Sequence, residues 1–221
     1  MIKYLKPILL SVIICTAMIS CGQKQPCTED INKLPLFGGV KKCEEQIGFD
    51  KKFIAESDKT MGRKEAAEKY VKMGWQYVYA KKADTAIMRF NQAWLLDSLN
   101  AGVYWGLGNV LGMQGKFKES LPYFEKSAKL KPGNVRLLQD MSTSYGNTFF
   151  ATKEQHYLNA AIMALYDAHK IEPANVVIVA QLAGAYSYFA QKDSANKYLK
   201  IADGLDPKAV NPAVRKILTG K

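Results

Sequence analysis

The 221-residue sequence predicts an all-α protein, built as a right-handed superhelical solenoid of helical hairpins. Two observations support this. Similar residues recur with a period of about 34 residues along most of the chain, and a turn-forming segment closes each period. A helix–turn–helix unit of this length cannot bury its apolar side alone, so successive units must stack on one another. The pattern therefore predicts about four stacked units and a short C-terminal capping helix.

The first helix of each unit carries a fixed pattern of large, apolar and small residues. Its positions in the four units are Tyr70, Met73, Gly74 and Tyr77; Tyr104, Leu107, Gly108 and Leu111; Leu138, Met141, Ser142 and Tyr145; and Val179, Leu182, Ala183 and Tyr186. The second helix has its own pattern, seen at Ala86, Phe90 and Ala93 and again at Ser120, Phe124 and Ser127. These matches predict four helical pairs.

The downstream half keeps the period in a shifted register. Four residues recur one full period later, so that Ala161, Leu165, Ala168 and Pro173 are followed by Ala195, Leu199, Ala202 and Pro207. The separation of Pro132 and Pro173, however, exceeds the period by seven positions. The third unit is therefore expected to carry a seven-residue insertion within Gly146 to Tyr157, between its two helices.

The residue types suit closely packed helical pairs. Small residues such as Gly74 and Gly108 let antiparallel helices approach, whereas Phe90 and Phe124 fill the space between successive pairs. Proline just past a second helix stops that helix and enforces the turn. A helix–turn–helix of about 34 residues with this pattern resembles the tetratricopeptide repeat (TPR) family over about residues 67–209. The resemblance implies units at 67–100, 101–134, 135–175 with the insertion, and 176–209.

The open ends of such a solenoid need caps. Residues 49–66 are expected to form the N-terminal cap, with three apolar residues beneath the first unit: Phe49, Phe53 and Ile54. Residues 210–221 are expected to form the C-terminal cap, because Asn211-Pro212 is typical of a helix start. That helix would cover the last unit with Val214, Ile217 and Leu218.

Residues 1–20 have the pattern of a signal peptide. Lys3 and Lys6 precede an apolar run from Pro7 to Ile19, which is shorter than the roughly 20 residues of a membrane-spanning helix. The run ends in Met18-Ile19-Ser20-Cys21, which resembles the lipobox of bacterial lipoproteins, although Met18 replaces the usual Leu. The resemblance implies cleavage before Cys21, a diacylglycerol on its thiol and an acyl chain on its amine. A plain transmembrane anchor, or a signal cleaved elsewhere, is the alternative.

The resemblance also suggests an address. Gly22 follows the cysteine, where the lipoproteins that enterobacteria retain in the inner membrane have Asp. In a bacterium of that kind, the expected location is the outer membrane, with the domain facing the periplasm.

The other cysteines are expected to differ in role. Cys15 lies in the apolar run and would be removed with it. Cys27 and Cys43 remain as a pair in an exported chain, where the compartment is oxidising. We expect them to form a disulfide in a lipidated tether over residues 21–48, worth about 3 kcal/mol by chain entropy. Two free thiols are the alternative, and the absence of a CxxC pair or a nearby His argues against a metal site.

The formal net charge is +11. Residues 22–66 hold nine basic and eight acidic side chains, so most of the excess lies in the repeats. Such a field attracts anionic membranes, acidic proteins, cell-wall polymers and nucleic acids, but lysine-rich helix faces are often merely solvated. A cytosolic nucleic-acid binder would rest on charge alone, and nucleic acid is not an expected partner.

Catalytic patterns are missing from the sequence. His156 and His169 do not belong to an HExxH pattern, and no GxSxG, Walker or dinucleotide motif occurs. We expect no enzyme, no cofactor and no metal.

TPR proteins bind peptides or protein surfaces in a concave groove lined by the first helix of each unit. When the groove positions of the family are carried over to this sequence by helical phase, the resemblance implies the following lining: Trp75, Tyr79, Trp105, Asn109, Met113, Arg136, Gln139, Thr143, Asn147 and Tyr188. Trp, Tyr and Arg dominate binding hot spots, although Trp75 and Trp105 could equally serve only to pack neighbouring helices. Phe149 and Phe150, beside the insertion, form a second contact site or simply pack the longer loop.

Asn109 matches one residue of the two-carboxylate clamp of chaperone-binding TPR proteins, but Trp105 stands where that clamp has a lysine. A C-terminal carboxylate ligand is therefore not expected. The sequence as a whole favours an envelope adaptor or assembly factor that binds another protein. The alternative is an envelope ligand-binding protein that captures a glycan, lipid or peptide in its aromatic groove.

Overall fold

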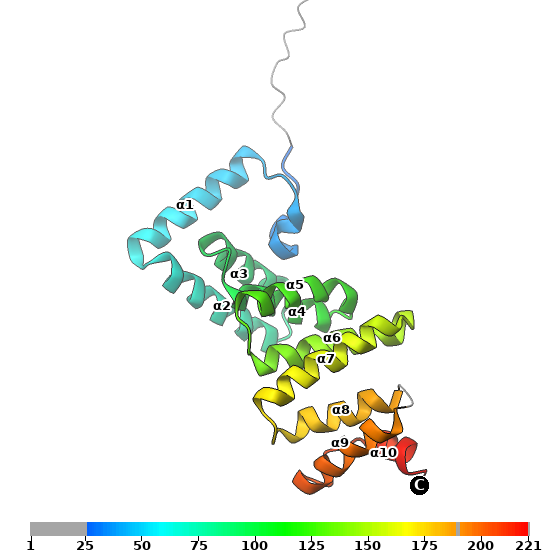
Figure 1. The fold of residues 1–221 in the computed structure, drawn as a ribbon. Coiled ribbons are helices and arrows are strands. Elements are labelled where there is room, and N and C mark those ends of the chain that lie inside the picture. The colour runs from blue at the N-terminus through cyan, green and yellow to red at the C-terminus, as the bar shows by residue number, and fades with distance from the viewer. Residues whose placement is uncertain (1–25, 189–190, 221) are drawn as a thin grey trace, which may run out of the picture.

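The computed structural model describes residues 26–188 and 191–220. The expected signal peptide and Cys21 lie outside the described residues. Within them the chain forms ten α-helices and two 3-10 helices, which Figure 1 shows as an elongated stack of helical pairs. None of these described helices has the length and apolar character needed to cross a membrane.

Four helical pairs make up the body of the stack. They are α2 (Arg63–Tyr79) with α3 (Ala83–Leu96), α4 (Ala101–Met113) with α5 (Phe117–Leu130), α6 (Val135–Thr152) with α7 (Gln155–Ile171), and α8 (Val176–Tyr188) with α9 (Lys192–Leu205). Each pair packs against the next, through α3 with α4, α5 with α6 and α7 with α8. The predicted all-α solenoid is confirmed.

An interlock between glycine and phenylalanine holds the first two pairs together. The Phe90 ring, fully buried on α3, lies against Gly74 of α2 and Gly106 of α4. A Cβ atom on Gly106 would lie 2.1 Å from Phe90 Cζ, and one on Gly74 would lie 2.5 Å from Phe90 Cε1. The ring therefore fits only because both helices lack a side chain at this point.

Asparagine ends each inter-unit turn and caps the following helix. The Asn100 side chain accepts a hydrogen bond from the Gly102 amide at 2.8 Å. The same type of cap recurs at Asn134, Asn175 and Asn211, before α6, α8 and α10 (Pro212–Thr219). A side-chain oxygen at this position satisfies an amide that has no partner within the helix.

The seven-residue insertion is helical, so the expectation that it would lie between the two helices is wrong. Helix α6 is five residues longer than α4, α7 is three residues longer than α5, and the connecting turn is one residue shorter. Polar side chains within the added turns bond back to the helix, as Thr148 Oγ1 donates to the Ser144 carbonyl at 2.8 Å. The helix ends at Thr152, and the C-cap residue Lys153 adopts a left-handed φ of 62°.

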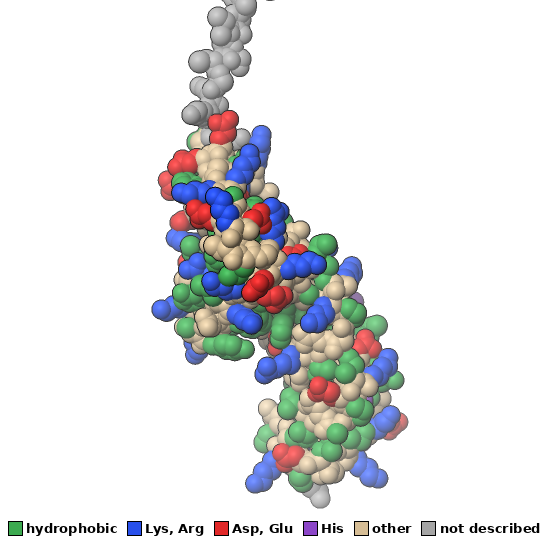
Figure 2. All heavy atoms as spheres, turned by 90° about the vertical axis from the view of Figure 1, so that its left-hand side faces the viewer, with side chains coloured by type: hydrophobic (Ala, Val, Ile, Leu, Met, Phe, Trp, Pro, Cys, Tyr) green, Lys and Arg blue, Asp and Glu red, His purple; other side chains and the backbone are tan. Residues whose placement is uncertain are grey.

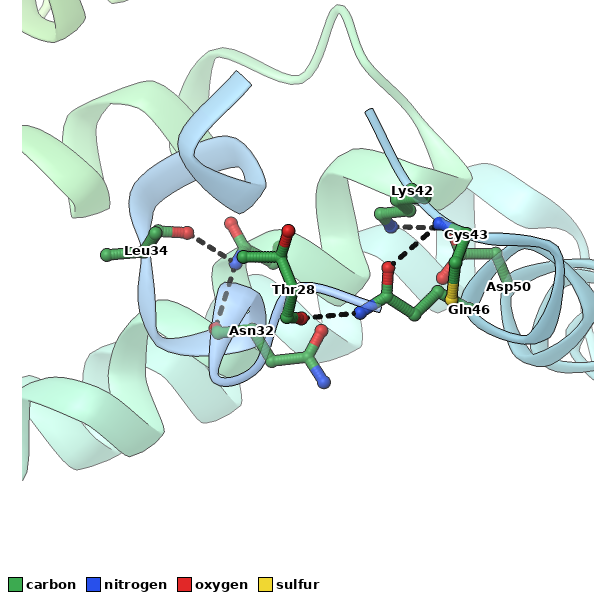
Figure 3. A network of polar contacts seen from close by, with 8 residues as sticks. Thr28, Asn32, Leu34, Lys42, Cys43, Gln46 and Asp50 are labelled. Atoms are coloured by element: carbon green, nitrogen blue, oxygen red, sulfur yellow. Dashed lines mark hydrogen bonds and ion pairs between the residues drawn. The ribbon is translucent and has the colours of Figure 1, made fainter. Parts of the chain in front are cut away.

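The expected tether is partly folded onto the body. Helices η1 (Ile31–Lys33) and η2 (Pro35–Gly39) pack on α3, with Ile31 and Phe37 buried. The buried Asn91 side chain of α3 holds them, because its Nδ2 donates to the carbonyls of Asn32 at 3.0 Å and Leu34 at 2.9 Å. Figure 3 labels these two partners. Asn91 Oδ1 accepts from the Leu36 amide at 2.8 Å.

A disulfide between Cys27 and Cys43, with Cα atoms 5.1 Å apart, joins the start of this segment to the start of α1 (Glu44–Thr60). Polar contacts reinforce the junction, as the Gln46 side chain accepts from the Cys43 amide and donates to the Thr28 carbonyl (Figure 3). Lys42 also pairs with Asp50. The N-terminal segment is therefore fixed to both α1 and α3.

Helix α1 begins five residues before the expected cap and covers the first unit. Phe53 and Ile54 pack against Ala66 and Leu96, as expected. Phe49 was expected to join them, but its side chain is 65% exposed. It lies one turn nearer the start of α1, where the helix borders the N-terminal segment and not α2.

Helix α10 covers the last pair through Val214 and Leu218, which pack on the α8–α9 core. Ile217, also expected there, is instead exposed. The Arg215 guanidinium fixes the helix by donating to both carboxylate oxygens of Asp203 on α9, and these hydrogen bonds lower the pKa of the Asp203 carboxyl.

A Gly106→Ala variant tests the interlock. The added methyl group would collide with the Phe90 ring, so we expect the free energy of unfolding to fall by about 1–3 kcal/mol. Gly112→Ala, on the same helix, is the matched control, because its nearest neighbour would be Ser144 Oγ at 3.7 Å. We expect this control to be neutral or stabilising by up to about 1 kcal/mol. Equal urea-denaturation midpoints for the two variants would contradict the interlock.

An Asn91→Ala variant tests the docking of the N-terminal segment. It removes three hydrogen bonds, each worth about 1 kcal/mol net. We expect faster hydrogen exchange in residues 31–39 while α4 to α9 keep their protection. The exposed Asn159→Ala serves as control, and unchanged protection of residues 31–39 in Asn91→Ala would show that the segment is held by other means.

Candidate functional site

The first helices of the four pairs, α2, α4, α6 and α8, carry the surface here called the groove face. The ten residues that the sequence predicted as its lining lie on these helices: Trp75 and Tyr79 on α2; Trp105, Asn109 and Met113 on α4; Arg136, Gln139, Thr143 and Asn147 on α6; and Tyr188 on α8. The face is hollowed at two places, between α2 and α4 and between α6 and α8.

Two tryptophans form a wall of the first hollow, which has a volume of about 420 Å³. The rings of Trp75 and Trp105 meet edge to face, with centroids 4.7 Å apart. Trp75 also packs edge to face on the buried Phe90, at 6.1 Å, and lies 6.0 Å from the largely exposed Tyr79. Trp75 therefore both packs on the core and lines the hollow.

Asp140 of α6, which is not among the predicted lining residues, holds two polar groups of α4 beside this hollow. Its Oδ2 accepts a hydrogen bond from Trp105 Nε1 at 2.8 Å and from Asn109 Nδ2 at 3.0 Å. Asp140 follows Arg136 by four residues and so shares its helix face, a signal that the sequence did contain. Because this carboxylate borders Asn109, it would repel a ligand carboxylate.

The second hollow, of about 250 Å³, is largely apolar and lies between α6 and α8 with α7 as its floor. Thr143 and Asn147 line one side, and Phe150 meets Tyr188 across it with centroids 5.0 Å apart. Phe150 belongs to the added turns of α6, whereas its neighbour Phe149 is half-buried and lines neither hollow. The insertion thus supplies one wall of this hollow.

Some predicted lining residues stand apart from the hollows. Met113 and Arg136 are exposed and, like Tyr79 and Asn109, line neither of them. Gln139 also lines neither hollow, and its Nε2 lies 3.5 Å from Oε1 of Gln181, a residue of α8 that lines the second. The predicted lining residues follow one helical periodicity in the sequence, but in the structure only some of them line a hollow.

The two histidines lie at opposite ends of α7. His156 is exposed on the first turn of α7, and His169, on its last turn, packs against Tyr198. Within residues 26–188 and 191–220, no three His, Cys, Asp or Glu side chains are grouped so as to hold a metal ion.

Basic side chains are spread over the molecule. Figure 2 shows lysine and arginine scattered along the whole visible face and interspersed with acidic groups, without a continuous basic stripe. On this face the positive charge is therefore a diffuse field and not a track for a nucleic-acid backbone.

Comparisons with known proteins identify the fold. No family model matches the sequence, and no curated protein matches it. Among solved structures, the chain is similar to YrrB, described as a TPR protein with an unusual peptide-binding site. The TM-score is 0.58 at 21% identity, over 70% of this chain and 75% of that one.

Two further structures show the same likeness. TTC0263, a TPR protein of Thermus thermophilus, gives a TM-score of 0.54 at 20% identity, over 69% of this chain and 79% of that one. PilF of Pseudomonas aeruginosa gives 0.57 at 19% identity, over 72% and 68%. The chain therefore has the fold of TPR proteins.

Proposed function

We propose that this protein is a non-catalytic, lipid-anchored adaptor or assembly factor of the bacterial cell envelope, which holds a segment of another protein against its groove face. Proteins with this fold typically serve protein–protein interaction, and YrrB is described as having a peptide-binding site. The proposal carries that activity over to this chain.

The groove face supports the proposal because it is hollowed and presents aromatic side chains to solvent. Tyr79 is 75% exposed, Tyr188 is 51% exposed and Phe150 is 44% exposed, one or more of them beside each hollow. The N-terminal segment, by contrast, packs on α3 and leaves this face open. Aromatic rings of this kind give large contact area at little conformational cost.

The N-terminal segment supports the anchor. Cys21 precedes Cys27 by six residues, which span at most roughly 20 Å when extended. Since Cys27 is bonded to Cys43 at the start of α1, a lipid on Cys21 would hold the body close to the membrane surface. The disulfide also suits an exported chain.

A second candidate is the capture of a small envelope ligand, a glycan or lipid, in the first hollow. Its volume of about 420 Å³ falls within the range of small-molecule sites, and its tryptophan wall suits an apolar ring face. Thermal shift with cell-wall fragments and with peptides separates the two candidates, because a bound ligand raises the melting temperature.

Site-specific photo-crosslinking in cells tests the binding face. We expect p-benzoylphenylalanine at position 79 and at position 188 to give adducts with the same protein. The control position is Tyr166, which is 45% exposed on α7 and lies away from the groove face. Equal yields of that adduct from position 166, or none from positions 79 and 188, would contradict the proposal.

Metabolic labelling with radioactive palmitate tests the anchor. We expect Cys21→Ser to abolish labelling and to release the protein from the membrane fraction. Cys15→Ser is the matched control and should label normally, because Cys15 lies within the expected signal peptide. Persistent labelling of Cys21→Ser, or no labelling of the unaltered protein, would contradict a lipid on Cys21.

A further inference from the structure

Several hydrogen-bond donors around the first hollow and on α6 already have partners within the protein. Trp105 Nε1 donates to Asp140, and Asn109 Nδ2 donates to Asp140 and to the Trp105 carbonyl. Asn100 Nδ2 donates to Glu68 Oε1 at 2.7 Å. On α6, the Thr143 hydroxyl and the Asn147 amide likewise donate to carbonyls of their own helix.

Three acceptors in the same region have no partner within the protein. Among the described residues, Asp140 Oδ1, Glu68 Oε2 and Asn109 Oδ1 receive no hydrogen bond. The other oxygen of Asp140 accepts from Trp105 and Asn109, and the other oxygen of Glu68 accepts from Asn100. A carboxylate fixed in this way keeps its free lone pairs in a set direction. A ligand that brings donors, and not acceptors, would complete this surface.

The charge at the first hollow is opposite to that of the molecule. Glu68 and Asp97 line it, and Asp140 borders it through Trp105, whereas Lys131 is the one basic residue in its lining. Arg136 is exposed and does not line it. The chain as a whole carries a formal charge of +11. The hollow is therefore an acidic place on a basic body.

The tryptophan wall adds a second reason to favour a cation. Trp75 and Trp105 are both half-buried, so part of each indole borders the hollow beside the carboxylates. An indole ring attracts a cation placed over its face, and its apolar surface packs against an aliphatic stem. Lysine and arginine side chains combine that stem with a donor-rich cationic head.

We infer that the first hollow of the groove face takes a lysine or arginine side chain of the bound protein segment, with the stem against Trp75 and Trp105. The cationic head would be attracted by Glu68, which lines the hollow, and by Asp140, which borders it behind Trp105. This inference rests on the proposed function, since it names the chemistry of the segment that the groove face would hold. Cationic segments would be repelled by most of this basic protein, so this hollow would be a local exception.

Titration of the full-length protein with defined peptides tests the inference. The probes are four acetylated peptide amides, Gly-Ala-X-Ala-X-Ala-Gly, in which X is arginine, its uncharged isostere citrulline, leucine or glutamate. Tryptophan fluorescence reports binding in about 0.15 M salt, where long-range attraction is screened. We expect the arginine peptide to bind roughly tenfold more tightly than the citrulline peptide, the scale of one desolvated cation–π contact with an ion pair.

Matched variants locate the effect. Asp140→Asn and Glu68→Gln should each remove most of the preference for arginine over citrulline. The control variants are Asp167→Asn on α7 and Glu65→Gln on α2, which remove the same charge at exposed positions. Both should retain the preference for arginine over citrulline. If Asp140→Asn disturbs folding, seen as a lower melting temperature, the Glu68→Gln pair alone decides.

The outcomes separate this inference from the proposed function. Tightest binding of the leucine or glutamate peptide, or equal losses in the control variants, would overturn the inference and leave the groove face as a binding surface. Binding of none of the four peptides would also overturn it. Only that result, combined with the absence of cross-links from positions 79 and 188, would remove the proposed function as well.

Discussion

The close approach of α2 and α4 around the Phe90 ring is the constraint on which the rest of the structure depends. Gly74 and Gly106 leave the space that this ring fills. Trp75 directly follows the first glycine and Trp105 directly precedes the second, so the same approach brings the two indoles to 4.7 Å. The packing of the core and the wall of the first hollow therefore have one cause.

Asparagine side chains fix both the inter-unit turns and the docking of the N-terminal segment. At the inter-unit turns it caps the next helix and so fixes the direction in which each pair continues. On α3 the buried Asn91 holds the N-terminal segment to the first pair, and the disulfide ties that segment to α1. Residues 27–43 are thus joined to α1 and α3.

The sequence predicted the fold because the repeat period constrains many positions at once, and the small and large residues of each helix agree with it. The sequence did not predict the features that depend on individual side-chain contacts. The insertion lengthened α6, which continues to Thr152, and α7, and nothing in its composition distinguished that outcome from a loop. Docking of the N-terminal segment on α3 involves the buried side chain of Asn91, whose partners Asn32, Leu34 and Leu36 are distant from it in the sequence.

The site shows the same division. Helical phase assigned the ten predicted residues to the first helices of the pairs, and five of them line the two hollows: Trp75, Trp105, Thr143, Asn147 and Tyr188. The hydrogen bonds of Asp140 to Trp105 and Asn109 could not be predicted, because they join two helices through particular rotamers, which the repeat period does not define. The wall formed by Phe150 with Tyr188 likewise depends on how far α6 extends.

Hydrogen exchange of the full-length protein, alone and in complex with the segment captured by cross-linking, tests the central claim most directly. Binding in the groove predicts slower exchange in α2, α4, α6 and α8, with the greatest change around Trp105 and Asp140, and little change in α3, α5, α7 and α9. Slower exchange confined to the second helices, or to α1 and the N-terminal segment, would contradict the account.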